Sequence, residues 1–182
     1  DNGPEHRPNT SFGTPGKLRG AKGHMHEGGY RVPGIIRWPG QIKAGSVSSL
    51  PVNGTDFLPS LASVAGAKPK YPNPVDGVNV FPALISGRSV KRPTPMMWWL
   101  YHARGAKEVS MRIGDYKMLA NMLPQPEVSI SDTRPPRGMA IMDFIKQSEL
   151  GNFTLYDLKN DPSETKNLAE SHPEKYSSMR QR

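Results

Sequence analysis

The 182-residue sequence contains no cysteine. Disulfide bonds, thiolate metal sites and cysteine nucleophiles are therefore excluded from this chain. The sequence also lacks any apolar run near the ~20 residues that a membrane-spanning helix needs, and its first residues do not show the charged-then-apolar pattern of a signal peptide. Hydrophobic residues make up only 35% of the chain, which is low but sufficient for a core.

Acidic residues are outnumbered by basic ones. Lysine and arginine together number 24 against 16 aspartates and glutamates, which gives a formal net charge of +8. This excess favours anionic partners, which include nucleic acid, anionic glycans and small sulfated or phosphorylated molecules, but charge does not choose among them. The 19 prolines and 18 glycines follow no period, which predicts a loop-rich globular protein rather than a repeat protein.

The most informative segment covers residues 17–40. Its first half is glycine-rich and carries several basic side chains: Lys17, Arg19, Lys22, His24 and His26. The glycines of this loop can adopt positive φ angles and let the backbone come close to a ligand, as a polyanion-binding loop requires. An ordinary solvated basic loop has the same composition. The second half, residues 32–38, is apolar and predicts one buried strand.

Two short patterns could bind a metal ion. Asp1 and Asn2 precede two turn-forming residues, an arrangement that suits a hard cation with oxygen ligands, although most such triplets are ordinary turns. His24 and His26 lie two residues apart, but the other histidines have no recognisable zinc-ligand spacing. Hydrogen bonding to an anionic substrate, or a structural role, is therefore favoured for both histidines.

The middle of the chain predicts one helix and one strand. Residues 56–65 have apolar side chains at helical spacing, with Thr55 as N-cap and Gly66 beyond the end, which predicts a short helix packed on the core. The proline-rich residues 68–74 predict a loop, and residues 75–84 predict a strand-and-turn segment.

From residue 96 onward the pattern changes to short alternating runs. Residues 96–101, 109–113, 116–118 and 153–158 predict a small antiparallel sheet of about four strands, with a hairpin at 114–115 and an excursion over 121–139. Ser171 and Glu174 have capping-box spacing and predict a terminal helix that presents Tyr176 and Met179 on one side.

Six segments together resemble a known family. They are DNG at residue 1, LRGAKGHMHEGGYRVPGIIRWPG at 18–40, TDFLPSLASVAG at 55–66, DGVNVFPAL at 76–84, MRIGDYKML at 111–119 and LYDLKNDPSETKNLAESHPE at 155–174. Their order and spacing resemble the C-terminal half of type I, formylglycine-dependent sulfatases, which include arylsulfatases and N-acetylgalactosamine-6-sulfatases. The resemblance covers nearly the whole chain except residues 120–150.

The resemblance implies a fold and its division into domains. The expected fold class is α/β, the alkaline-phosphatase-like fold of sulfatases. Residues 1–90 would form the C-terminal part of the large mixed-sheet catalytic domain. Residues 91–182 would form a small C-terminal subdomain with an antiparallel sheet of about four strands and a terminal helix. The resemblance also implies a periplasmic or secreted protein.

Family chemistry transfers to a few positions. Asp1 and Asn2 match the pair that binds the active-site Ca²⁺, and Lys22 matches the lysine that contacts the sulfate group. His24 and His26 lie where the family loop varies and are candidate substrate contacts. His102 beside the Trp98-Trp99 run is a candidate glycan contact, although a core strand with a solvated turn is the favoured interpretation there.

The family nucleophile is not found in this sequence. The family makes formylglycine from the Cys or Ser of a Cys/Ser-x-Pro-x-Arg motif, whereas Ser49 and Ser171, which begin Ser-x-Pro, have Asn53 and Lys175 at the arginine position. We therefore expect the nucleophile-bearing N-terminal half to be missing and this chain alone to be inactive.

The implied substrate is a sulfated carbohydrate or small sulfate ester rather than nucleic acid. Two alternatives remain. The first is a non-catalytic basic module that binds polyanions or glycans. The second is a phosphomonoesterase or phosphonate hydrolase of the same superfamily, against which the Asp-Asn pair and the Lys-Gly-x-x-x-Glu-Gly-Gly pattern favour a sulfatase.

Overall fold

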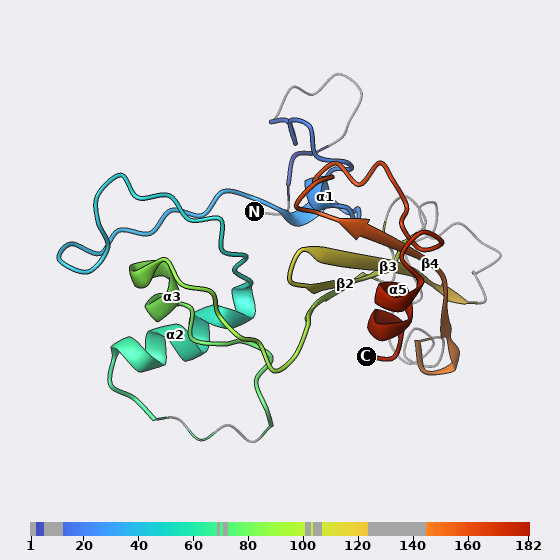
Figure 1. The fold of residues 1–182 in the computed structure, drawn as a ribbon. Coiled ribbons are helices and arrows are strands. Elements are labelled where there is room, and N and C mark those ends of the chain that lie inside the picture. The colour runs from blue at the N-terminus through green and yellow to red at the C-terminus, as the bar shows by residue number, and fades with distance from the viewer. Residues whose placement is uncertain are drawn as a thin grey trace. The chain divides into compact units, whose positions relative to one another are not determined.

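The computed structural model describes residues 3–5, 13–68, 70, 73–100, 103, 107–123 and 145–182. The chain divides into two compact units, one made of residues 1–33 and 97–182 and the other of residues 34–96. No described helix is both long and apolar enough to cross a membrane. The elements, shown in Figure 1, are α1 (Glu27–Tyr30), η1 (Gly54–Asp56), α2 (Phe57–Val64), α3 (Phe81–Ser86), β1 (Met96–Trp99), β2 (Val109–Ile113), β3 (Tyr116–Leu123), β4 (Glu149–Asp157) and α5 (Pro173–Arg180).

The predicted four-stranded sheet is confirmed. Its strand order is β1-β2-β3-β4, and β3 pairs antiparallel with both β2 and β4. The β2–β3 hairpin turns at Gly114, whose φ of +61° suits glycine, and Ile113 pairs with Tyr116 across the turn. Because β3 continues to Leu123, the first residues of the predicted excursion belong to the sheet. Residues 124–144 lie outside the described residues.

The two faces of the sheet are covered by different parts of the chain. Side chains alternate between faces along a strand. On one face a buried cluster joins the sheet to the C-terminal segment: Met111, Met118, Leu155, Leu168 and Met179. On the other face a second cluster joins the sheet to the glycine-rich loop: Met25, Leu119, Tyr156 and Leu158. The sheet therefore has buried side chains on both faces, and β3 contributes one to each cluster.

The terminal helix α5 forms where the sequence predicts it, but without the predicted capping box. Met179 is 1% exposed and Tyr176 packs against the same cluster, which confirms the predicted packing side. The N-cap residue is His172, with no side-chain cap, because the Ser171 hydroxyl donates to the Leu168 carbonyl instead. Pro173 then starts the helix, at a position where its missing N–H has no helical partner to lose.

The helix predicted at 56–65 forms as α2, but the predicted N-cap and the predicted packing on a core are wrong. A capping box joins Asn53 and Asp56 ahead of the helix, so Thr55 is not the N-cap. The apolar residues of α2 are half exposed rather than packed on a core: Phe57 49%, Leu58 54%, Leu61 57% and Val64 47%. The residue it buries is Ser60, whose hydroxyl accepts the Val80 N–H at 3.0 Å.

Two predicted strands are wrong. Residues 32–38 form no strand, and Ile35 is 95% exposed, because no described strand pairs with this apolar segment. Within residues 75–84, helix α3 begins at Phe81 instead of a strand. The Asn79 side chain accepts the Phe81 N–H at 3.1 Å, and Gly87 ends the helix with a φ of +70°. The Asn79 bond is the kind of local side-chain-to-backbone contact that competes with strand pairing.

Candidate active-site loop

The glycine-rich loop folds back on itself before it enters α1. The Gly28 N–H donates to the Arg19 carbonyl at 2.8 Å, and a Cβ on Gly28 would lie 2.4 Å from the Gly20 carbonyl oxygen. A Cβ on Gly29 would lie 2.0 Å from the His24 carbonyl oxygen. The sequence predicted that these glycines allow close approach to a ligand. In the structure, Gly28 and Gly29 instead allow close contact with backbone carbonyl oxygens of the loop itself.

Residues 3–5 lie along this loop. Gly3 has a φ of +76°, and a Cβ there would lie 2.6 Å from the Gly28 carbonyl oxygen. The Lys22 N–H donates to the Pro4 carbonyl at 3.0 Å. Asp1 and Asn2 lie outside the described residues. Gly3, which follows them in the chain, packs against the glycine-rich loop that carries Lys22.

The side chain of Lys22 is partly exposed to solvent. Its side chain is 50% exposed, and its Nζ is 3.7 Å from Glu5 Oε2. A half-exposed pair at this distance contributes about 0–1 kcal/mol to stability, so an anion that offers shorter contacts can compete for the ammonium group. The surroundings of Lys22 therefore suit the binding of an anion.

The two loop histidines differ in environment. The His24 Nδ1 lies 2.9 Å from the Ala21 carbonyl oxygen and 3.2 Å from the Ala21 nitrogen, so the tautomer decides which of them it bonds. His26 is 5% exposed and its ring lies edge-on to Tyr156. Burial, followed by the nearby charge of Arg19, lowers the pKa of His26 to about 3, so this imidazole is neutral at pH 7. Burial favours the structural role for His26.

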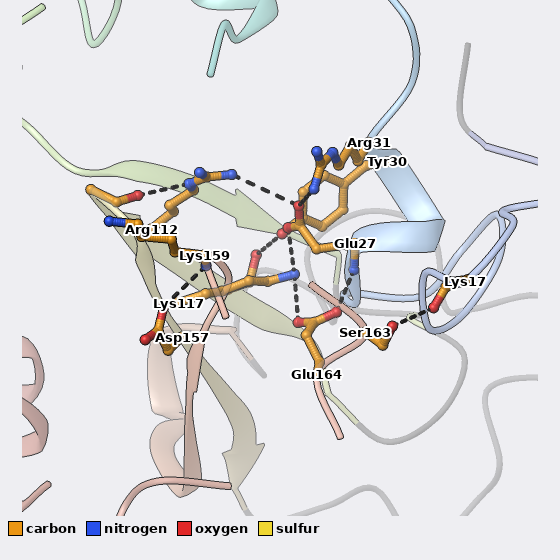
Figure 2. A network of polar contacts seen from close by, with 12 residues as sticks. Lys17, Glu27, Tyr30, Arg31, Arg112, Lys117, Asp157, Lys159, Ser163 and Glu164 are labelled. Atoms are coloured by element: carbon orange, nitrogen blue, oxygen red, sulfur yellow. Dashed lines mark hydrogen bonds and ion pairs between the residues drawn. The ribbon is translucent and has the colours of Figure 1, made fainter. Parts of the chain in front are cut away.

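A buried ion-pair cluster fixes the end of the loop to the sheet (Figure 2). Lys117 of β3 is 0% exposed, and its Nζ lies 3.1 Å from Glu27 Oε1 and 2.9 Å from Glu164 Oε1. Glu164 Oε2 also accepts the Glu27 backbone N–H at 2.6 Å. Burial raises the pKa of Glu164, while the Lys117 ammonium opposes that shift. One buried lysine thus pairs with two carboxylates that come from distant segments of the chain.

Further groups surround this cluster. Glu27 Oε2 lies 3.6 Å from an Arg31 guanidinium nitrogen and 3.8 Å from one of Arg112. The Lys117 Nζ lies 4.6 Å from the centre of the Tyr30 ring, which stacks on Trp98 with ring centres 4.5 Å apart. Burial also raises the pKa of Tyr30 well above its usual value, so this phenol stays protonated. The carboxylates are therefore enclosed by cations and an aromatic ring.

The segment that carries Glu164 holds the start of the loop as well as its end. The Ser163 hydroxyl donates to the Lys17 carbonyl at 2.6 Å, and an Arg19 guanidinium nitrogen donates to the Glu164 carbonyl at 3.1 Å. Glu164 has a φ of +53°, in the left-handed region that non-glycine residues seldom adopt. Such a conformation persists where the surrounding contacts hold it in place.

Sequence reasoning missed Lys117 and Glu164. The alternating pattern of β3 predicts that the Lys117 side chain faces solvent. Glu164 lies in a polar turn. The available signal was that both lie in segments quoted for the family resemblance, at 111–119 and 155–174. Glu27 also lies in a segment quoted for the resemblance, the one at 18–40.

No metal centre is visible in the described part of the chain, where no group of three or more potential His, Asp or Glu ligands occurs. His24 and His26 therefore do not form a zinc site with a further described ligand. Asp1, Asn2 and His102 lie outside the described residues. The side-chain oxygens of Asp1 and Asn2 are ligands of the type Ca²⁺ prefers, but they supply only two of the six to eight that Ca²⁺ takes.

Comparison with known proteins gives consistent matches. The family described as sulfatase matches residues 1–67. Arylsulfatase A from Bos taurus is 34% identical over 172 residues, which cover 94% of this chain and 32% of that protein. N-acetylgalactosamine-6-sulfatase from Sus scrofa is 33% identical over 105 residues, which cover 58% of this chain and 19% of that protein. The chain spans about a third of the length of the first of these relatives.

Solved structures match as well. Ps i-CgsB superimposes with a TM-score of 0.64 at 27% identity, covering 89% of this chain and 30% of that one. A crystal structure of Ps i-CgsB in complex with k-i-k-neocarrahexaose gives the same TM-score at 25% identity. The predicted fold class, the alkaline-phosphatase-like α/β fold of sulfatases, is confirmed. By sequence and by fold, the chain belongs to the sulfatase family.

Proposed function

We propose that this chain is part of a sulfatase that hydrolyses sulfate esters, and that Lys22 contacts the sulfate group. The observation that carries the proposal is an exposed lysine on a loop held by buried contacts, in a chain of the sulfatase family. A sulfated carbohydrate is the proposed substrate class. In support, one relative is named N-acetylgalactosamine-6-sulfatase, and a structural neighbour was crystallised with k-i-k-neocarrahexaose.

Lys22 would act through charge. When a sulfate ester is cleaved, negative charge builds up on its oxygens, and a nearby ammonium group stabilises that charge in the transition state. At ~3 Å and an effective dielectric constant of ~20, the attraction is about 5 kcal/mol before desolvation. Because the loop is fixed at both ends, its lysine needs little reorganisation to make this contact.

Asp1 and Asn2 are the residues of this chain that would hold Ca²⁺, through oxygen. A bound Ca²⁺ would stabilise negative charge on a sulfate oxygen as a Lewis acid. Other parts of the protein would supply the remaining ligands and the nucleophile, a formylglycine for which this chain offers no residue. The proposed division places residues 1–90 in the catalytic domain and 91–182 in the small subdomain.

Further roles are proposed for three histidines. His24 is a candidate substrate contact beside Lys22, whereas the burial of His26 limits it to contacts made through a rearranged loop. His102 is a candidate glycan contact. A periplasmic or secreted location is proposed from the family resemblance.

The test is Lys22→Ala in the full-length protein, assayed with an aryl sulfate and a sulfated oligosaccharide. We expect kcat/KM to fall about 10²- to 10³-fold, the scale of one lost electrostatic contact at a developing charge. Lys166→Ala, which removes an exposed lysine of the same unit, is the matched control and should change kcat/KM less than about twofold. If kcat/KM of a correctly folded Lys22→Ala protein falls less than threefold, Lys22 does not contact the sulfate group.

The same assay separates the alternatives. Hydrolysis of aryl phosphates in preference to sulfates would indicate a phosphatase, and glycan binding without turnover by the full-length protein would indicate a binding module. Asp1→Ala should lower calcium content and activity together, since a hard cation loses an anionic oxygen ligand.

A further inference from the structure

Residues 163–164 contact the glycine-rich loop that carries Lys22, and these contacts suggest a function beyond stabilising the fold. They reach the loop at its start, through the Lys17 carbonyl and the Arg19 side chain, and at its end, through the Glu27 N–H. Lys22 lies between these anchored positions and has one described ion pair, a half-exposed one to Glu5. The Lys22 backbone N–H also donates to the Pro4 carbonyl at 3.0 Å, so the contacts at the two ends of the loop act together with this bond on the position of the ammonium group.

We propose that Glu164 is a positioning residue for Lys22, with Lys117 as the counter-charge that pairs with its carboxylate and orients it toward the loop. The inference rests on the proposed sulfatase function and adds to it a requirement for the C-terminal segment. Glu164 would not touch the substrate. It would hold the loop in one conformation, so that Lys22 is already in position when the sulfate group binds.

Three observations carry the proposal. Glu164 is 0% exposed and is bonded to the loop by both its side chain and its backbone carbonyl. Its positive φ is a costly conformation, and such outliers concentrate where a particular geometry is needed. Lys117 lies between the carboxylates of Glu164 and Glu27, so it links the sheet, the loop and the C-terminal segment (Figure 2).

The test is a double-mutant cycle in the full-length protein, with Glu164→Gln and Lys22→Ala separately and together. Glutamine keeps the size and one acceptor oxygen but loses the charge that Lys117 compensates. If Glu164 acts through Lys22, E164Q should lower kcat/KM about 10- to 100-fold when Lys22 is present and less than about threefold in the K22A protein. Equal factors in both backgrounds would overturn the proposal, because they would mean a general structural role.

Asp56→Asn is the matched control. Asp56 is another fully buried carboxylate that accepts backbone N–H groups, from Asn53 and Val78, and pairs with an arginine, Arg92. D56N should lower stability but should change kcat/KM by the same factor with and without Lys22. If E164Q does not fold, Lys117→Arg keeps the charge, alters the geometry and should show the same dependence on Lys22.

A second measurement needs no activity. In E164Q, amide hydrogen exchange should speed up at residues 19–29 and stay unchanged in the β2–β3 hairpin, because the loop loses its anchor while the sheet keeps its own bonds. Unchanged exchange in the loop would overturn the proposal. Faster loop exchange in a full-length protein that hydrolyses no sulfate ester would instead retain the anchoring role and reject the sulfatase function.

Discussion

His26 shows how its environment changes the chemistry of a single residue. Two histidines of one loop invite an interpretation as cations or metal ligands, yet the ring of His26 is 5% exposed and packs against Tyr156. Its pKa is lowered to about 3 because burial disfavours the imidazolium form, and Arg19 and Lys117 disfavour it further. A histidine in this state adds a neutral ring to the core and no charge to the anion-binding side of the loop.

The lowered pKa predicts how stability depends on pH. Between about pH 6.5 and 3 an unfolded chain protonates this histidine and the folded chain does not, so His26 contributes stability above pH 6.5 that is lost as pH falls. The slope is up to about 1.4 kcal/mol per pH unit. Urea unfolding at pH 7, 6 and 5 should show a smaller pH dependence for His26→Gln than for the original protein. Parallel curves for the two proteins would contradict the prediction.

The loop and α1 together act as one element, since backbone contacts close the loop and buried charges attach it to the sheet. Gly28 and Gly29 are needed because carbonyl oxygens occupy the space of a side chain. The same Glu-Gly-Gly triplet supplies the buried carboxylate that Lys117 meets. One short stretch therefore provides both the closure of the loop and its anchor.

Gly29→Ala tests this element. The added methyl would lie 2.0 Å from the His24 carbonyl oxygen, so the backbone between residues 21 and 29 must move. We expect kcat/KM of the full-length protein to fall at least about 10-fold, because a displacement near 1 Å can cost that much or more. Gly34→Ala is the control, since nothing lies within 4 Å of a Cβ there and its φ is not positive. Equal activities of the two variants would show that loop closure does not position Lys22.

At the scale of the whole molecule, the chain offers some of the groups that the proposed sulfate ester hydrolysis needs. It offers a candidate cation in Lys22 and two candidate oxygen ligands in Asp1 and Asn2, and no cysteine. The half-exposed apolar residues of α2 form a stripe typical of a surface that other protein covers. Both features agree with a chain that spans about a third of the length of bovine arylsulfatase A.

We predict that residues 1–182 alone do not hydrolyse an aryl sulfate, with or without calcium. Removing the nucleophile leaves at most the residual effects of binding and electrostatics. The purified chain should also self-associate in sedimentation experiments through the exposed face of α2. The full-length protein, assayed in parallel, is the positive control. Calcium-dependent turnover by the short chain would mean that it contains a nucleophile that its sequence does not reveal.

The sequence by itself determined the elements that depend on local patterns. The alternation in β2 and β3, the glycine at position 114, the helical spacing in α2 and the Ser-x-Pro-Glu start of α5 are properties of a few consecutive residues. All four elements form, although β3 extends into the predicted excursion, α2 has a different cap and α5 lacks its capping box. The family resemblance, and with it the fold class, also came from motifs in order along the chain. Lys22 could be named as a candidate for the same reason.

Only the tertiary structure decided which side chains are buried and what they contact. Glu27 and Glu164 are 137 positions apart in the sequence, and no local pattern indicates that one accepts the backbone N–H of the other. Lys117 occupies a polar position in an alternating strand, and it is buried because the loop covers that face of the sheet. Conversely, residue 35 belongs to an apolar run and is exposed, because no described strand covers it. Burial is a property of the partners that fold against a residue, and those partners are distant in sequence.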